Sequence, residues 1–187
     1  EVVVQRSPGL SSHMEFAPAS GWLYMADTGN ERILRLDPNS GQIAGSLNPY
    51  GETLAGYWNM SGTVWNVVAD TGLIKPTGLD IYEGRLLVSD YSNGNIIVYD
   101  ITQDPVVELG RIETGISNQV MGLKVGPDGA IWFVCHNDNE LYQLTTLLMG
   151  DVNGDGYFTI YDIIICARYV LGLWELDEAA VYRSDVN

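Results

Sequence analysis

The chain has 187 residues, 46% of them hydrophobic and 18% charged, which is enough for one medium domain and a small second unit and excludes extensive disorder. Its 24 acidic and 9 basic residues give a net charge of -15, which repels phosphate backbones and anionic membrane surfaces. We therefore expect no nucleic-acid partner, and no apolar run approaches the roughly 20 residues needed for a membrane span.

One sequence pattern occurs three times, in residues 21–37, 84–100 and 129–144. Each copy has an apolar run, then a cluster rich in Asp, Asn and Gly, and then a second run in which apolar and polar residues alternate. This order predicts a β-hairpin, with a buried strand, a turn and a more exposed partner strand. The chain therefore contains three hairpin units.

Further short strands are expected around these hairpins. One precedes each hairpin and one follows each of the first two, in residues 13–16, 77–81, 121–125, 42–47 and 106–112. Units of about 45 residues with four antiparallel strands are typical of β-propeller blades. The first unit is longer, and we interpret residues 48–75 as an insertion.

The first hairpin, at residues 23–33, resembles those of NHL-repeat propellers. The resemblance covers residues 10–146 and is weakest in the third unit, where Cys135 and His136 replace the Ala/Ser–Asp step. It implies a propeller that usually closes with six blades, whereas three blades cannot close. Either further blades precede this chain, or copies assemble.

Residues 1–5 fit an outer strand left over from a preceding blade, while the third unit has no evident fourth strand. The first strand of the same chain, or that of another copy, would fill this gap. Unclosed sheets expose strand edges that favour association, so self-association is one expectation.

After residue 148 the pattern changes to a loop that is typical of calcium sites. Oxygen ligands fall at loop positions 1, 3, 5, 7, 9 and 12, with Gly156 at position 6. The expected ligands are Asp151, Asn153, Asp155, the carbonyl of Tyr157, Thr159 and Asp162. A hard cation needs six to eight oxygens, so the spacing predicts bound Ca²⁺. The alternative interpretation is an ordinary turn, or a degenerate loop without an ion.

Residues 162–171 predict a helix that begins at Asp162 and stops at Gly172. With its Asp at position 12, this loop and helix resemble a type I dockerin, an EF-hand-like module. Asp185 and Asn187 restart the loop 34 positions after Asp151, as in a duplicated dockerin segment, but the second loop stops after its third position. The resemblance implies docking to a cohesin-like domain or another protein.

Other candidate residues have simpler interpretations. His13 would line the channel of a propeller, where enzymes of related shape hold metals, but two histidines are few for a zinc site. Asp27 and Asp90 are expected to cap turns. Trp58 and Trp65 favour packing over sugar binding.

The sequence as a whole predicts a mainly β protein. We expect NHL-like propeller blades in residues 1–147 and a small α-helical, dockerin-like module in residues 148–187. The leading functional hypothesis is a secreted or cell-surface, calcium-binding scaffold protein without enzymatic activity. The alternatives are a subunit of a self-assembling extracellular fibre or sheath, and a metal-dependent propeller lyase or lactonase that uses His13.

Overall fold

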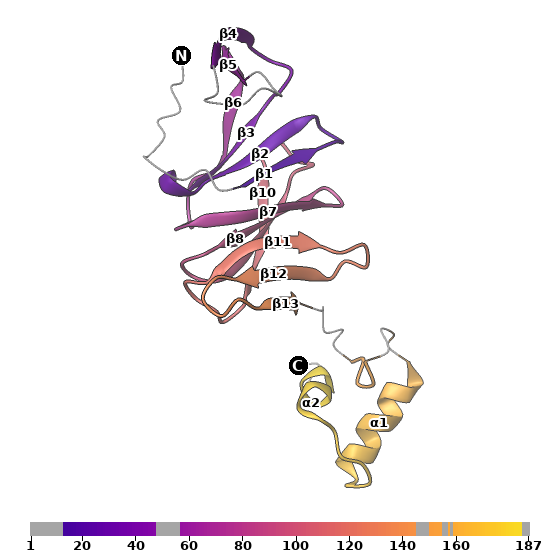
Figure 1. The fold of residues 1–187 in the computed structure, drawn as a ribbon. Coiled ribbons are helices and arrows are strands. Elements are labelled where there is room, and N and C mark those ends of the chain that lie inside the picture. The colour runs from indigo at the N-terminus through magenta and orange to yellow at the C-terminus, as the bar shows by residue number, and fades with distance from the viewer. Residues whose placement is uncertain (1–12, 48–56, 145–149, 155–156, 158, 185–187) are drawn as a thin grey trace. The chain divides into compact units, whose positions relative to one another are not determined.

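The computed structural model describes residues 13–47, 57–144, 150–154, 157 and 159–184. The chain divides into two compact units, Glu1–Gln143 and Leu144–Asn187. The described residues of the larger unit form four antiparallel sheets, and those of the smaller unit form two short helices (Figure 1). The fold is therefore mainly β, and the described strands form no closed propeller.

The first sheet has the strand order β1-β2-β3-β6. Its strands are β1 (His13–Ala17), β2 (Trp22–Asp27), β3 (Arg32–Leu36) and β6 (Trp65–Ala69), with a 3-10 turn, η1 (Thr28–Asn30), between β2 and β3. The predicted first hairpin is present, because β2 and β3 pair in register from Leu23 opposite Leu36 to Asp27 opposite Arg32.

The prediction that residues 42–47 form the fourth strand of this sheet is wrong. These residues form β4 (Gln42–Leu47), which pairs with β5 (Tyr57–Ser61) in a separate two-stranded sheet. The fourth position belongs to β6, inside the predicted insertion. The Asp37 N–H donates to the Val64 carbonyl (3.0 Å) and the Val64 N–H donates to the Ser40 hydroxyl (2.8 Å). These bonds close the base of the extra hairpin and return the chain beside β3.

The second and third sheets follow the predicted pattern more closely. The second consists of β7 (Pro76–Tyr82), β8 (Arg85–Asp90), β9 (Asn95–Asp100) and β10 (Val107–Glu113), in the order β10-β9-β8-β7. The third consists of β11 (Val120–Val125), β12 (Ile131–Cys135) and β13 (Leu141–Leu144). The first strands of the three sheets, β1, β7 and β11, lie side by side, so the three sheets are stacked in sequence order.

The main core lies between the first two sheets. Fully buried apolar side chains meet there from both sheets: Tyr24, Ala26, Ile33, Leu79, Leu86, Val88 and Ile97. The second and third sheets are joined by buried hydroxyl groups, since Ser89 donates to the Met121 carbonyl and Thr77 contacts the carbonyls of Val120 and Met121. Apolar burial and backbone ladders hold this unit together.

The smaller unit has helices α1 (Ile160–Val170) and α2 (Glu178–Ser184). The predicted start of α1 at Asp162 is two residues late, because Thr159 is the N-cap and Asp162 is the third helical residue. Gly172 ends the helix with a φ of 67°, as its sequence position predicted. The Gly172 N–H bonds to the Tyr169 carbonyl and the Leu173 N–H to that of Arg168. Neither helix is long and apolar enough to cross a membrane.

Candidate calcium-binding loop

Asp162 organises the loop that precedes α1. Its side chain is fully buried and accepts four hydrogen bonds. Its Oδ1 accepts from the N–H groups of Val152 (2.9 Å) and Asn153 (3.2 Å). Its Oδ2 accepts from the Thr159 N–H (2.7 Å) and hydroxyl (3.0 Å). One carboxylate thus ties the beginning of the loop to its end.

Thr159 and Asp162 also form a capping box at the start of α1. The Thr159 hydroxyl accepts from the Tyr161 N–H at 3.2 Å, while Asp162 bonds back to the Thr159 N–H. This reciprocal pairing satisfies orphan N–H groups of the first helical turn. Asp162 therefore makes hydrogen bonds in both the loop and the first turn of the helix.

These hydrogen bonds shift the pKa of the Asp162 carboxyl below its ordinary value. The largest cause is the bond from the Thr159 N–H, and bonds from Asn153, Val152 and the Thr159 hydroxyl act in the same direction. Burial opposes the shift because it disfavours the charged form. The described donors to Asp162 are uncharged, so the buried carboxylate carries its negative charge into the loop.

Asp151 is the second buried carboxylate of the loop, with 3% of its surface exposed. Its Oδ1 accepts from the Gly154 N–H at 2.8 Å, which closes a tight turn. Gly154 has a φ of 75°, a backbone conformation that favours glycine. The carboxyl groups predicted for positions 1 and 12 are therefore both folded into one small loop.

Arg183 of α2 forms hydrogen bonds with the backbone at the start of the loop. Its Nε donates to the Asp151 carbonyl at 2.7 Å and its Nη2 to the Val152 carbonyl at 3.1 Å. The Gly150 N–H donates to the Arg183 carbonyl at 2.7 Å. Sequence reasoning missed this residue, because an arginine 32 positions after Asp151 has no motif that links it to the loop.

The remaining predicted ligands have varied surroundings. Asn153 is exposed, Thr159 is half-buried, and 72% of the Tyr157 surface is exposed. Asp155, predicted for position 5, and Gly156, predicted for position 6, lie outside the described residues. Within the described part of the chain, no three His, Cys, Asp or Glu side chains group as metal ligands. The predicted calcium ligands also include Asp155, which lies outside the described residues, and oxygens of Asn153, Tyr157 and Thr159, which are not acidic.

The residues of the loop fit a hard cation in their chemistry. Carboxylate, amide, hydroxyl and carbonyl oxygens are the ligands that Ca²⁺ takes. Two buried carboxylates in one short loop concentrate negative charge there, and a bound cation would stabilise their charged forms further. Asp162 already uses both oxygens as acceptors, so an ion would share them with the loop N–H groups.

The other candidate residues have structural partners. His13 Nε2 lies 3.8 Å from Glu15 Oε2, and the same oxygen accepts from Lys124 Nζ at 2.6 Å. Lys124 also donates to Asp80 Oδ1 at 2.7 Å, so this cluster joins β1, β7 and β11. The ion pairs of Lys124 connect the three strands, while His13 contacts Glu15 within β1; these contacts give no support to a histidine metal site. Cys135 and Cys166 are free thiols.

Asp27 and Asp90 bind turn residues, as their positions predicted. Asp90 is completely buried and accepts from the N–H groups of Ile74, Lys75 and Ser92. Asp27 accepts from the Asn30 amide and pairs with Arg32 at 2.8 Å. Trp65 lies in β6 and donates to the Thr63 hydroxyl at 2.7 Å, while the side chain of Trp58 lies outside the described residues.

Comparison with known proteins adds no assignment: no protein-family profile matches the sequence, and no curated protein matches it.

Proposed function

We propose that this chain is a calcium-binding interaction protein in which the loop at residues 151–162 controls a docking helix. The observation that carries the proposal is that Asp162 is at once a buried carboxylate of the loop and the capping residue of α1. An ion bound to this carboxylate would fix the first turn of the helix. Ca²⁺ is the proposed cofactor, held by Asp151, Asn153, Asp155, the Tyr157 carbonyl, Thr159 and Asp162.

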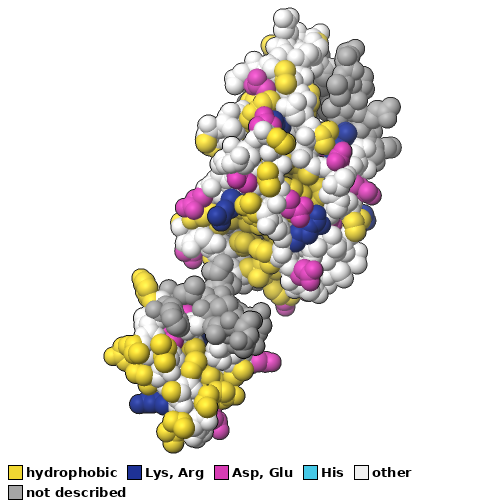
Figure 2. Space-filling model, turned by 180° about the vertical axis from the view of Figure 1, so that it is seen from behind, with side chains coloured by type: hydrophobic (Ala, Val, Ile, Leu, Met, Phe, Trp, Pro, Cys, Tyr) yellow, Lys and Arg dark blue, Asp and Glu magenta, His cyan; other side chains and the backbone are white. Residues whose placement is uncertain are grey.

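The helix controlled by this loop has exposed apolar side chains. They lie on several sides of α1, and each is at least 41% exposed: Ile160, Tyr161, Ile163, Ile164, Tyr169 and Val170. Figure 2 shows hydrophobic side chains gathered on one face of the smaller unit. Exposed apolar patches of this kind favour a protein partner. A cohesin-like domain or another protein of similar apolar surface is the proposed partner.

For the larger unit we propose a partial β-propeller with NHL-like blades that serves as a scaffold. Its support is the repeated order of strands, with an inner strand, a hairpin and an outer strand, and the side-by-side inner strands β1, β7 and β11. Calcium loops and docking modules of this kind suit a secreted or cell-surface protein, which is the proposed location. No described contact favours the lyase or lactonase alternative.

Calorimetric titration with Ca²⁺ tests the proposal on the full chain. We expect Asp155→Ala and Asp151→Asn each to weaken binding by orders of magnitude, because removing a carboxylate leaves too few oxygens to replace water. Asp104→Asn is the matched control, since this side chain is 77% exposed in the larger unit and should leave the affinity unchanged. Equal affinities in all variants would place the ion elsewhere and reject the proposal.

A further inference from the structure

Two consecutive peptide groups at the start of the loop are hydrogen-bonded at both their N–H and their C=O. The first joins Asp151 to Val152, and the second joins Val152 to Asn153. Their N–H groups donate to Asp162 Oδ1, at 2.9 Å and 3.2 Å. Their carbonyls accept from Arg183, at 2.7 Å from Nε and at 3.1 Å from Nη2. A buried carboxylate and a guanidinium therefore hold the same two peptide groups.

The two charged groups lie on opposite sides of this segment. The C=O and N–H bonds of a planar trans peptide point in opposite directions, so the donor to the carbonyl and the acceptor of the N–H face each other across the backbone. Because both peptide planes are held, the φ and ψ angles of Val152 between them are held as well. These two angles set the path of the backbone from Asp151 to Asn153, the predicted ligands at loop positions 1 and 3.

The Arg183 guanidinium also packs against the tight turn that follows. Gly154 has a φ of 75°, and its N–H donates to Asp151 Oδ1 at 2.8 Å. A Cβ placed on Gly154 would lie 3.3 Å from Arg183 Nη2 and 3.6 Å from its Cζ. The guanidinium therefore contacts residues 151–154 at two carbonyls and at the glycine of the turn.

Helix α2 holds Arg183 in this position. Arg183 lies in the last turn of this seven-residue helix, and its carbonyl accepts from the Gly150 N–H at 2.7 Å. At the other end of α2, the Asp177 side chain accepts from the N–H of the buried Ala180 at 2.7 Å. The end of α2 is thus joined to the start of the loop by backbone and side-chain bonds, all within the smaller unit.

This bonding pattern depends on the shape of the arginine side chain. A guanidinium carries its N–H donors in one rigid plane, so it reaches two consecutive carbonyls at once. A lysine at position 183 would keep the positive charge but would be a single flexible point charge. Hydrogen bonds from a charged donor are also stronger than those between neutral groups. Charge and shape therefore make separable contributions.

We propose that Arg183 is a positioning residue of the calcium site. A guanidinium has no acceptor atom and cannot be a ligand. Its role is to hold the backbone that carries Asp151 and Asn153 in place before an ion binds, so that α2 is part of the site. The inference rests on the proposed calcium function, but the holding of the ion-free loop is tested without calcium.

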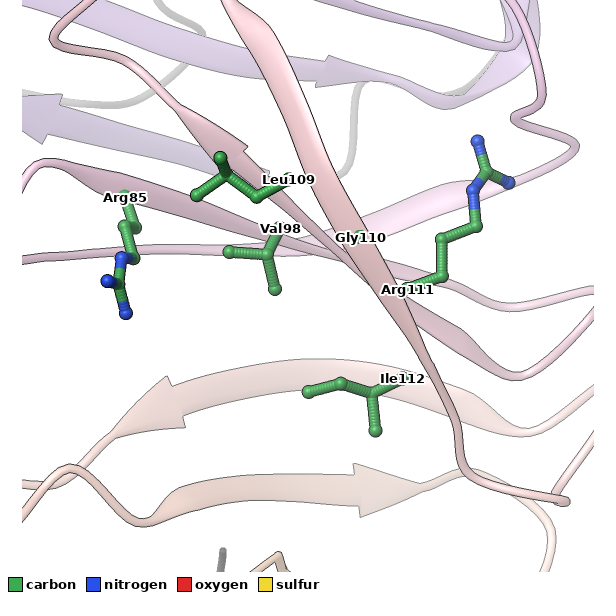
Figure 3. Close-up of a pocket in the computed structure, with 6 residues that line it drawn as sticks. All are labelled: Arg85, Val98, Leu109, Gly110, Arg111 and Ile112. Carbon is green, nitrogen blue, oxygen red and sulfur yellow. The ribbon is translucent and has the colours of Figure 1, made fainter. Parts of the chain in front are cut away.

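An arginine of the larger unit supplies the matched control. Arg111 of β10 donates from Nη1 to the Gly72 carbonyl at 2.6 Å and from Nε to Glu108 at 2.7 Å. Figure 3 shows that its guanidinium points away from Val98 and Leu109. These residues line a hollow of about 390 Å³ together with Arg85, Gly110, Arg111 and Ile112. Arg111→Met removes one positive charge and one bond to a carbonyl, as Arg183→Met does, but outside the loop.

Amide hydrogen exchange in calcium-free solution tests whether Arg183 holds the loop. We expect the amides of Val152 and Asn153 to exchange roughly tenfold faster in Arg183→Met, because two charge-assisted bonds to their peptide groups are lost. Arg111→Met should leave both rates unchanged. Unchanged rates in Arg183→Met would overturn the inference whether or not the chain binds calcium.

Calorimetry of the full chain with Ca²⁺ tests the effect on the site. Arg183→Met should weaken binding by about tenfold or more, as removal of groups behind metal ligands does. Losing a positive charge would by itself strengthen the attraction for a cation, so weaker binding reports lost positioning. Arg183→Lys should restore the affinity only in part, and the helical circular dichroism at saturating calcium should be the same in all variants.

The outcomes separate this inference from the proposed function. A wild-type chain that binds no Ca²⁺ would reject the proposed function, and the exchange rates alone would then decide whether Arg183 holds the loop. Normal wild-type binding with an unchanged affinity in Arg183→Met would overturn only the inference. Complete rescue by Arg183→Lys, or an equal loss of affinity in Arg111→Met, would also overturn it, because either result would assign the effect to charge alone.

Discussion

The two units of the chain are stabilised by different means. The larger unit buries big apolar side chains such as Tyr24, Leu79 and Ile97 between its sheets. Among the described residues of the smaller unit, the buried apolar side chains are only Val152 and Ala180, and most apolar side chains of α1 are exposed. The smaller unit also buries two carboxylates, those of Asp151 and Asp162. We therefore expect the larger unit to stay folded without an ion, and the smaller unit to depend on the partners of its buried carboxylates.

The largest effect is expected from Asp162→Ala. Removing this carboxylate leaves the N–H groups of Val152, Asn153 and Thr159 without their acceptor and removes a proposed ion ligand. We expect calcium affinity to fall by orders of magnitude and the helical circular dichroism at 222 nm to decrease. The β-sheet signal should stay unchanged. Retention of the helix with normal affinity would show that Asp162 does not link the loop to α1.

Leu79→Ala tests the stability of the larger unit. This side chain is completely buried in the main core, so its truncation should destabilise the sheets by about 3 kcal/mol. Urea denaturation followed by tryptophan fluorescence measures the loss, and calcium affinity should not change. Leu109→Ala is the control, since this side chain is 54% exposed and should cost much less. A matching loss of calcium binding in Leu79→Ala would mean that the two units are not independent.

Lowering the pH should destabilise the loop gradually, with a smaller effect than the two substitutions above. The folded-state pKa of Asp162 is lowered, so its contribution to stability is fully present above the unfolded value of about 3.9. This contribution is lost as the pH falls through the lowered folded-state pKa. In calcium-free solution, the amide signals of Ala167 should report the transition by NMR. The transition should shrink in Asp162→Asn, and an identical profile in both proteins would exclude Asp162 as its source.

Local signals in the sequence predicted most of the β unit. Each hairpin is defined by turn residues close to its strands, and β10 was expected because it directly follows its hairpin. The fourth strand of the first sheet was misassigned because two segments have strand character, residues 42–47 and Trp65–Ala69. The choice is made by contacts between distant residues: β6 pairs with β3, and the Asp37 N–H donates to the Val64 carbonyl beside that pairing. Such long-range pairing has no local sequence signal.

For the candidate loop, the sequence predicted the type of the ligand residues but not the residues from α2 that hold the loop in place. Spacing alone selected Asp151 and Asp162, and both are buried in one loop. The Arg183 clamp from α2 was not predicted, because its contacts are with backbone carbonyls that any sequence provides. The ion-pair cluster of Lys124 was missed for a related reason, since its partners come from different sheets.

Hydrogen exchange with and without calcium tests the central claim most directly. Amide protection in residues 160–172 should fall when calcium is chelated, because an isolated helix of about eleven residues is marginal in water and depends on its fixed first turn. Protection at Ala26 and Val88, in the cores of the first two sheets, should stay the same. Equal protection of α1 in both conditions would contradict the claim that the ion organises the docking helix.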